Sequence, residues 1–84
     1  MPEEIVGKIA GYFKKIDVAA IDITHGILKV GDTIHIHGHT TDLTQKVESM
    51  QIEHEQVQEV KAGNSIGIKV NGAVRHNDAV YKVV

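Results

Sequence analysis

The chain has 84 residues, of which 42% are hydrophobic and 24% charged, as is typical of one small globular domain. Its formal net charge of −2 is unlike the basic excess of a general nucleic-acid binder, although net charge does not fix how charge is distributed over the surface. The absence of cysteine excludes disulfides, thiolate metal sites and a cysteine nucleophile. Without a long apolar run or a signal-like N-terminus, we expect no membrane span and a cytoplasmic protein.

The first expected strand is IVGKIAGYF. Its residues Ile5, Ile9 and Phe13 recur at even spacing and therefore fall on one face, which places Phe13 in the core. Gly7 and Gly11 fall on the same face. Glycine inside a strand indicates a bulge, a bend or the close approach of another backbone.

Further short strands follow along the chain, separated by turns that contain glycine. THGILKVGD is expected to be a turn-rich connection, and HEQVQEVKAGN a short strand or a helical turn. In the longest of the later strands the spacing of apolar residues changes near Ser49, which indicates a β-bulge there. These strands are VAAIDI (18–23), TIHIH (33–37), LTQKVESMQIE (43–53), SIGIKV (65–70) and AVYKVV (79–84). Such a series predicts a small all-β barrel or sandwich, formed by residues 1–84 as a single domain.

Four motifs in a fixed order resemble domain 2 of the elongation factor Tu family of translation GTPases. They are KVGD at 29–32, the strand VESMQI at 47–52, AGNSIG at 62–67 and RHND at 75–78, and the resemblance covers roughly residues 5–80. It implies a small closed antiparallel barrel of six or seven strands that contacts the aminoacyl end of tRNA, ribosomal RNA or a G domain, mostly through loops. The pattern LKVGD…TQK is also similar to the C-terminal barrel of collagenase-like peptidases. Neither GxxxxGK[ST] nor NKxD occurs, so we expect no GTPase activity and no bound nucleotide.

Two histidines of TIHIH are weak candidates for a metal site. Ile34 and Ile36 alternate with His35 and His37, and burial of the isoleucines turns the imidazoles outward. We expect Lys46 on the neighbouring strand to lie beside His35 and to repel a cation. A structural zinc site needs four ligands, so we interpret the histidines as surface residues and expect no cofactor. A weak metal-binding protein is the third of three functional alternatives.

Six basic side chains form a candidate surface for RNA phosphates, provided that the barrel brings the ends of its strands together. No acid pair or serine has the setting of a catalytic group, so we expect a non-enzymatic binding module for RNA or a translation component. The chain has three aromatic residues, too few for a base-stacking platform. The alternatives are plain solubilising charge and a protein–protein interaction adaptor. The six candidates are Lys14, Lys15, Lys69, Arg75, His76 and Lys82.

Overall fold

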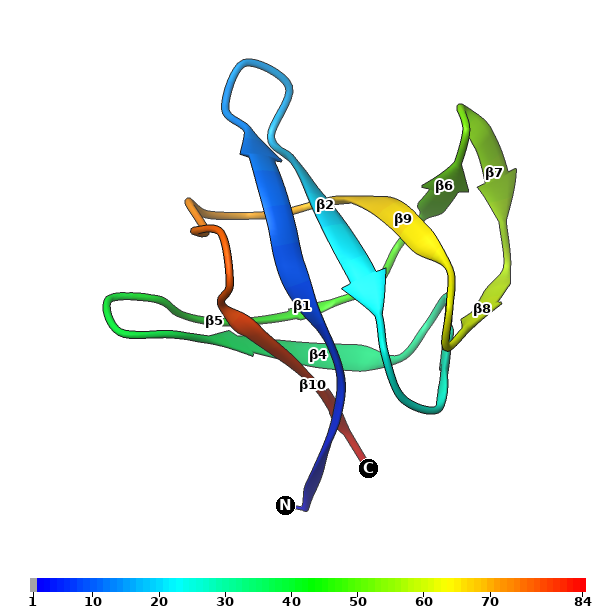
Figure 1. Ribbon diagram of the computed structural model, residues 1–84, viewed down its shortest axis with the longest axis horizontal. Coiled ribbons are helices and arrows are strands. Elements are labelled where there is room, and N and C mark those ends of the chain that lie inside the picture. The colour runs from blue at the N-terminus through cyan, green and yellow to red at the C-terminus, as the bar shows by residue number, and fades with distance from the viewer. Residues whose placement is uncertain (1) are drawn as a thin grey trace.

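The computed structural model describes residues 2–84, and all of the regular structure in that range is β-strand (Figure 1). This confirms the all-β prediction, although there are ten strands, several of them very short, in place of the six or seven expected. They are β1 (Glu3–Phe13), β2 (Val18–Ile23), β3 (Ile27–Lys29), β4 (Thr33–His37), β5 (Asp42–Lys46), β6 (Met50–Ile52), β7 (Glu55–Val57), β8 (Glu59–Lys61), β9 (Ser65–Lys69) and β10 (Ala79–Val83). Within residues 2–84 no helix has the length and apolar character that a membrane crossing requires.

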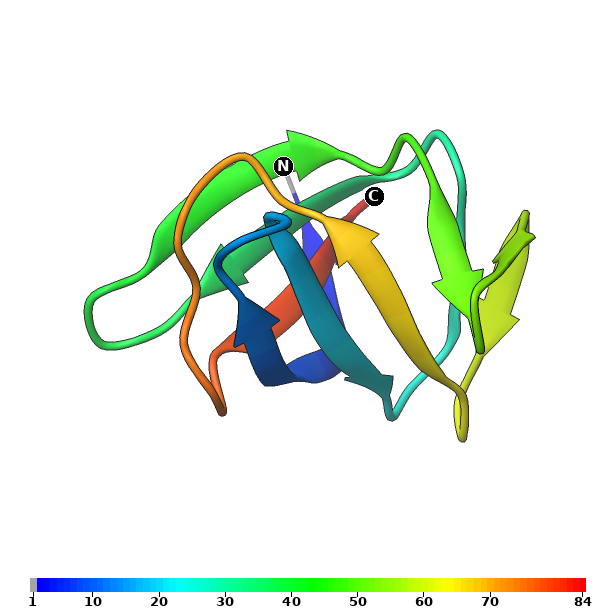
Figure 2. The same ribbon diagram turned by 90° about the horizontal axis from the view of Figure 1, so that it is seen from above.

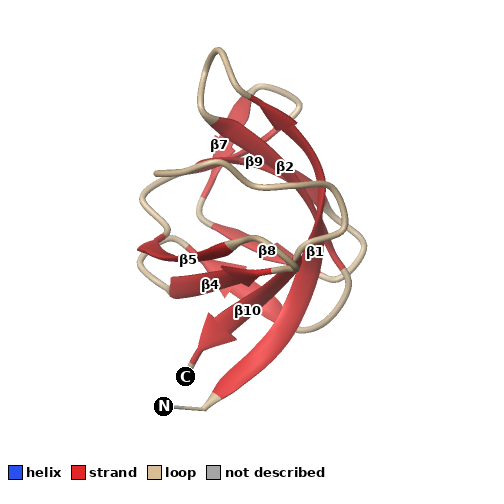
Figure 3. Cartoon of the chain, turned by 90° about the vertical axis from the view of Figure 1, so that its left-hand side faces the viewer, coloured by secondary structure: helices blue, strands red, loops and turns tan. Residues whose placement is uncertain are grey.

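Eight strands form one antiparallel sheet in the order β5-β4-β10-β1-β2-β9-β6-β7, and β3 pairs separately with β8. The sheet curls strongly, so that β4 and β5 lie across the molecule from β2 and β9 (Figure 2). The start of β1 and the end of β10 lie together at one end of the molecule (Figure 3). In the described residues the sheet order begins with β5 and ends with β7, so the hydrogen-bonded ladder alone does not establish a closed barrel.

The inner face of the curled sheet is covered by branched aliphatic side chains, which suit strands because their bulk packs well on a pleated surface. Full burial of each large side chain contributes about 1.5–3 kcal/mol. Ile34 and Ile36 are fully buried, as the alternation in TIHIH predicts. The core consists of Val6, Ile9, Ala19, Ile21, Ile23, Leu28, Ile34, Ile36, Val47, Met50, Val60, Ile66, Ile68, Val70, Val74 and Val80.

Two β-bulges in β1 change which of its residues face the core. Against β10 the pairing steps from Ile5 directly to Gly7, and against β2 it steps from Ile9 to Gly11. Each extra residue reverses the alternation of the strand. Ile5 is therefore 41% exposed, and Phe13, expected in the core, is 55% exposed.

The segment LTQKVESMQIE is not one strand with a bulge, as expected, but two strands separated by residues 47–49. Val47 turns away from the sheet because its backbone pairs with the KVGD turn. Its N–H donates to the carbonyl of Asp32, and its carbonyl accepts from the N–H of Gly31, both at 2.8 Å. The side chain of Val47 remains fully buried, so the break preserves the core.

The connection expected at residues 24–32 contains the short strand β3, which buries Leu28 and pairs with β8. Glycines with positive φ flank this strand, at Gly26 (68°) and Gly31 (100°). Because glycine is typical of turns, the sequence predicts a connection here and not the three-residue strand. The segment 54–64 forms β7 and β8, which confirms the strand alternative over the helical turn.

Gly7 and Gly11 provide a matched test of the bends in β1. A Cβ at Gly7 would lie 2.2 Å from the carbonyl oxygen of Asp22, a backbone atom, whereas a Cβ at Gly11 would meet nothing within 4 Å. We expect Gly7→Ala to lower the free energy of unfolding by about 1–3 kcal/mol. Gly11→Ala should leave it unchanged or raise it by up to about 1 kcal/mol. Urea denaturation measures both, and equal effects would contradict the close approach of β1 to β2.

Candidate functional site

The turn between β1 and β2 presents apolar and basic side chains together. Phe13 and Ile16 are 55% and 63% exposed, and Lys14 and Lys15 lie between them. The turn is tight, because the N–H of Ile16 donates to the carbonyl of Phe13 at 3.2 Å. An exposed aromatic ring beside two ammonium groups can contact a planar ring and a nearby anion at the same time.

An open groove of about 470 Å³ runs beside this turn, across the outer face of β2, β9 and β6. Ala20 pairs with Gly67, and Gly67 pairs with Gln51, so one row of residues crosses the three strands. Ala20 has a small side chain and Gly67 has none, so this row leaves the centre of the groove open. The groove is lined by Phe13, Ile16, Val18, Ala20, Gln51, Glu53, His54, Ser65, Ile66 and Gly67.

The far side of the groove is the two-residue turn between β6 and β7. Glu53 and His54 both adopt positive φ, 50° and 68°, a conformation that favours glycine or asparagine. Each such residue costs on the order of 1–2 kcal/mol relative to the right-handed region. The turn thus holds a carboxylate and an imidazole at the edge of the groove despite an unfavourable backbone.

Three of the predicted RNA-binding residues belong to the end of the molecule that carries the groove. Lys14 and Lys15 lie in the β1–β2 turn, and Lys69 ends β9, where it pairs with Val18. The N–H of Val70 donates to the carbonyl of Asp17 at 2.8 Å, which joins the end of β9 to the turn. All three lysines are exposed.

The other three candidates lie elsewhere. Arg75 and His76 are exposed in the loop before β10, which is held against the middle of β1 by bonds of 2.8 Å between Ile9 and residues 77 and 78. Lys82 pairs with Glu4 near the start of β1, at the end of that strand opposite the turn. Its Nζ donates to the carbonyl of Ile27 at 3.0 Å.

The predicted set of basic residues omitted the apolar part of this surface. Regular alternation along β1 predicts Phe13 in the core only because it takes no account of the two bulges. The glycines at 7 and 11 were the available signal, since a bulge at each one reverses the face of every later residue.

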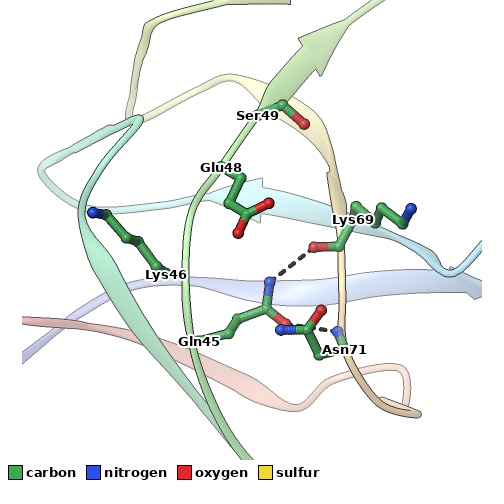
Figure 4. Close-up of a pocket in the computed structure, with 6 residues that line it drawn as sticks. All are labelled: Gln45, Lys46, Glu48, Ser49, Lys69 and Asn71. Carbon is green, nitrogen blue, oxygen red and sulfur yellow. Dashed lines mark hydrogen bonds between the residues drawn. The ribbon is translucent and has the colours of Figure 1, made fainter.

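A second hollow, of about 180 Å³, lies where β5 meets the end of β9 (Figure 4). The side chain of Gln45 spans it: Nε2 donates to the carbonyl of Lys69, and Oε1 accepts from the N–H of Asn71, both at 2.8 Å. Gln45 is only 8% exposed, whereas the ammonium groups of Lys46 and Lys69 point away from the hollow. This hollow is therefore a structural junction rather than a basic site.

The histidines of β4 face outward, as predicted, but their neighbours differ from the expected ones. Lys46 lies opposite Thr33, and His35 lies opposite Thr44. His35 contacts two carboxylates instead: Asp42 Oδ1 at 2.5 Å from Nε2, and Glu3 Oε2 at 3.0 Å from Nδ1. Hydrogen bonds that the ring donates to Asp42, the larger effect, and to Glu3 raise the pKa of His35 above its usual 6.5. In residues 2–84 no three histidine or acidic side chains are grouped so that they could hold a metal ion.

Comparisons with known proteins place this fold among translation factors and peptidases. The model of the family described as elongation factor Tu domain 2 matches residues 17–80. An uncharacterized protease of Methanocaldococcus jannaschii is 44% identical over 77 residues, which are 90% of this chain and 19% of that protein. A collagenase of Porphyromonas gingivalis is 40% identical over 78 residues, 92% of this chain and 22% of that protein. The chain thus spans about a fifth of the length of these relatives.

The similarity extends to a solved structure. The C-terminal domain of a Geobacillus thermoleovorans protein described as a U32 peptidase superimposes with a TM-score of 0.88. The match covers 96% of this chain and 93% of that one, at 18% sequence identity. At this identity the match shows a shared fold.

The strained turn at the edge of the groove gives a prediction about stability. Replacing Glu53-His54 with Asn-Gly, the residues that suit this turn, should raise the free energy of unfolding by roughly 1 kcal/mol. Glu55→Gly, at the first residue of β7, should lower it because glycine adds conformational freedom to the unfolded chain without relieving a positive φ. Thermal unfolding of the two variants decides the matter, and a destabilised Asn-Gly variant would refute the strain.

The junction at Gln45 gives a second prediction. Gln45→Ala removes the partners of two backbone groups, and we expect a loss of about 2 kcal/mol in the free energy of unfolding. Gln51→Ala, at an exposed glutamine of β6, should change it by less than about 0.5 kcal/mol. Denaturant titrations compare the two, and similar values would mean that the Gln45 bonds contribute little.

Proposed function

The chain belongs to the elongation factor Tu domain 2 family, and from this premise we propose that it is a non-enzymatic binding module that contacts single-stranded RNA. The contact surface is the groove beside the β1–β2 turn. The observation that carries the proposal is the exposure of Phe13 next to Lys14 and Lys15, above an apolar groove.

A single ring does not make the extended stacking platform that the sequence argues against, but stacking of one unpaired base is the interaction that Phe13 supports best. The ring of Phe13 is 55% exposed, and an aromatic side chain with few rotatable torsions loses little conformational freedom when a base covers it. Ile16 and Val18 extend the apolar surface beside the ring. Stacking on an aromatic side chain contributes about 1–3 kcal/mol per base and tolerates any base.

Charge around the groove supports a contact of limited extent. Three ammonium groups are available for phosphates, on Lys14, Lys15 and Lys69. The carboxylate of Glu53, on the far side of the groove, repels phosphates. Three phosphate contacts on a single strand give a salt slope of about −2 in log affinity against log salt concentration. This modest slope is consistent with a chain whose net charge is −2.

The second candidate function is a protein-interaction adaptor, which the comparisons favour in one respect. In the protease of Methanocaldococcus jannaschii the matching segment is 19% of the protein, so a similar domain there accompanies a much longer chain. The same groove with its exposed Phe13 and Ile16 would then pack on protein. RNA is preferred here because Lys14 and Lys15 directly separate the two apolar side chains.

We also propose that the curled sheet functions as a closed barrel in the cytoplasm. The bonds from Gln45 to Lys69 and Asn71 support closure, because they join edge strand β5 to the end of β9. A closed barrel leaves fewer unpaired strand edges and holds the β1–β2 turn in a fixed position.

Binding of a labelled, unstructured RNA oligonucleotide, measured by fluorescence anisotropy at several salt concentrations, tests the proposed function. Phe13→Ala should weaken binding by about 1–3 kcal/mol with an unchanged salt slope. The double change Lys14→Ala with Lys15→Ala should reduce the slope by about 1.4. Lys82→Ala is the control. Lys82 lies beside the start of β1, away from the groove, so this variant should bind the RNA as the wild type does.

Two results would overturn the RNA proposal. One is no binding even at low salt, which would favour the adaptor function. The other is equal weakening by Phe13→Ala and Lys82→Ala, which would place the contact away from the groove.

A further inference from the structure

His35 bridges two acidic side chains at the end of the molecule opposite the groove. Glu3 at the start of β1 and Asp42 at the start of β5 contact its two ring nitrogens, at 3.0 and 2.5 Å. The imidazole itself lies on β4, and β10 runs between β4 and β1. The side chain of Glu3 therefore reaches across a whole strand to meet it.

The protonation state of His35 follows from the geometry of these contacts. A carboxylate only accepts hydrogen bonds, and a neutral imidazole carries a single N–H. Both ring nitrogens face carboxylate oxygens, so both bonds form only when the ring is doubly protonated. Loss of one proton leaves a nitrogen lone pair directed at a carboxylate and breaks one of the two bonds.

The surroundings of His35 add few competing charges. Besides Glu3 and Asp42, the titratable and charged groups on this face are His37 on the same strand, Tyr81 on β10, Lys46 further along β5 and Lys8 on β1, which pairs with Ala79 opposite His37. The ring centroids of His37 and Tyr81 lie 5.5 and 6.3 Å from that of His35. The side chain of His35 is only 20% exposed, so solvent screens its contacts only in part.

The segment that Glu3 anchors is the part of β1 with the fewest other attachments. Residues 3–5 pair with β10 alone, whereas pairing with β2 begins at Gly7. Ile5 is 41% exposed and contributes little burial. The segment is held by its ladder with β10, by the bond of 3.0 Å from the N–H of Val84 to the carbonyl of Pro2, and by the contact of Glu3 with His35.

We propose that His35 is a proton-dependent latch that fastens the start of β1 to β4 and β5. When the ring is doubly protonated, Glu3 is tied across β10 and residues 3–5 stay in the sheet. When the ring loses a proton, one tie is lost and this segment separates from β10. The hollow of about 410 Å³ that Glu3, His35, His37 and Tyr81 line then loses the wall that Glu3 forms.

The direction of the pH dependence follows from linkage. The contacts with Asp42 and Glu3 raise the pKa of His35 in the folded protein above its usual 6.5. The stabilisation is therefore complete below pH 6.5 and is lost as pH rises through the folded-state pKa.

Nuclear magnetic resonance follows the latch and the segment in one sample. The ring ¹⁵N shifts report the protonation of His35, and the Cα shifts with the heteronuclear Overhauser effects of residues 3–5 report their strand structure. We expect residues 3–5 to lose strand character with the same pH midpoint as the His35 ring. Glu3→Gln and Asp42→Asn should each move that midpoint to lower pH.

Two variants separate the latch from a general effect of pH. His35→Gln should remove the transition of residues 3–5, and His37→Gln, which changes a histidine two positions away, should keep it. The latch is refuted if residues 3–5 stay ordered while His35 deprotonates, or if His35→Gln shows the same transition. RNA binding by the groove plays no part in this experiment, so its outcome is independent of the proposed function.

Discussion

The close packing of β1 on its two neighbours is the constraint on which the rest of the structure depends. Gly7 lies so near the carbonyl oxygen of Asp22 that no side chain fits between the two strands. The bulges beside Gly7 and Gly11 bend β1 and allow it to pair with β10 along its first half and with β2 along its second. This bent strand curls the sheet around the aliphatic core and carries Phe13 outward at the end of the strand.

β1 also connects the two surfaces that carry chemistry. Its last residue, Phe13, contributes to the groove, and its first residue, Glu3, contacts His35. The groove end combines exposed apolar side chains with lysines, whereas the opposite end combines a histidine with carboxylates. The bonds between Gln45 and residues 69 and 71 join β5 to the end of β9, so the strands of the two surfaces belong to one connected sheet.

The sequence predicted those features that depend on local alternation and on motif order. The burial of Ile34 and Ile36 and the family both follow from such patterns. Features that depend on pairing between distant segments could not be read in this way. Val47 leaves its strand only because it bonds to the KVGD turn, and Glu3 meets His35 only because β10 brings β1 beside β4. The exposure of Phe13 lies between these cases. Gly7 and Gly11 indicate bulges in the sequence, but they do not reveal which face the later residues of β1 occupy.

Amide chemical shifts of isotope-labelled protein, recorded while an unstructured RNA oligonucleotide is added at low salt, test the central claim most directly. The account predicts that the shifted amides cluster in the residues that form the groove and its turn, at 11–20, 51–54 and 65–69. It also predicts that these shifts diminish as salt is raised, because phosphate contacts weaken. Shifts confined to the start of β1 and the end of β10, or no shifts at any salt concentration, would contradict it.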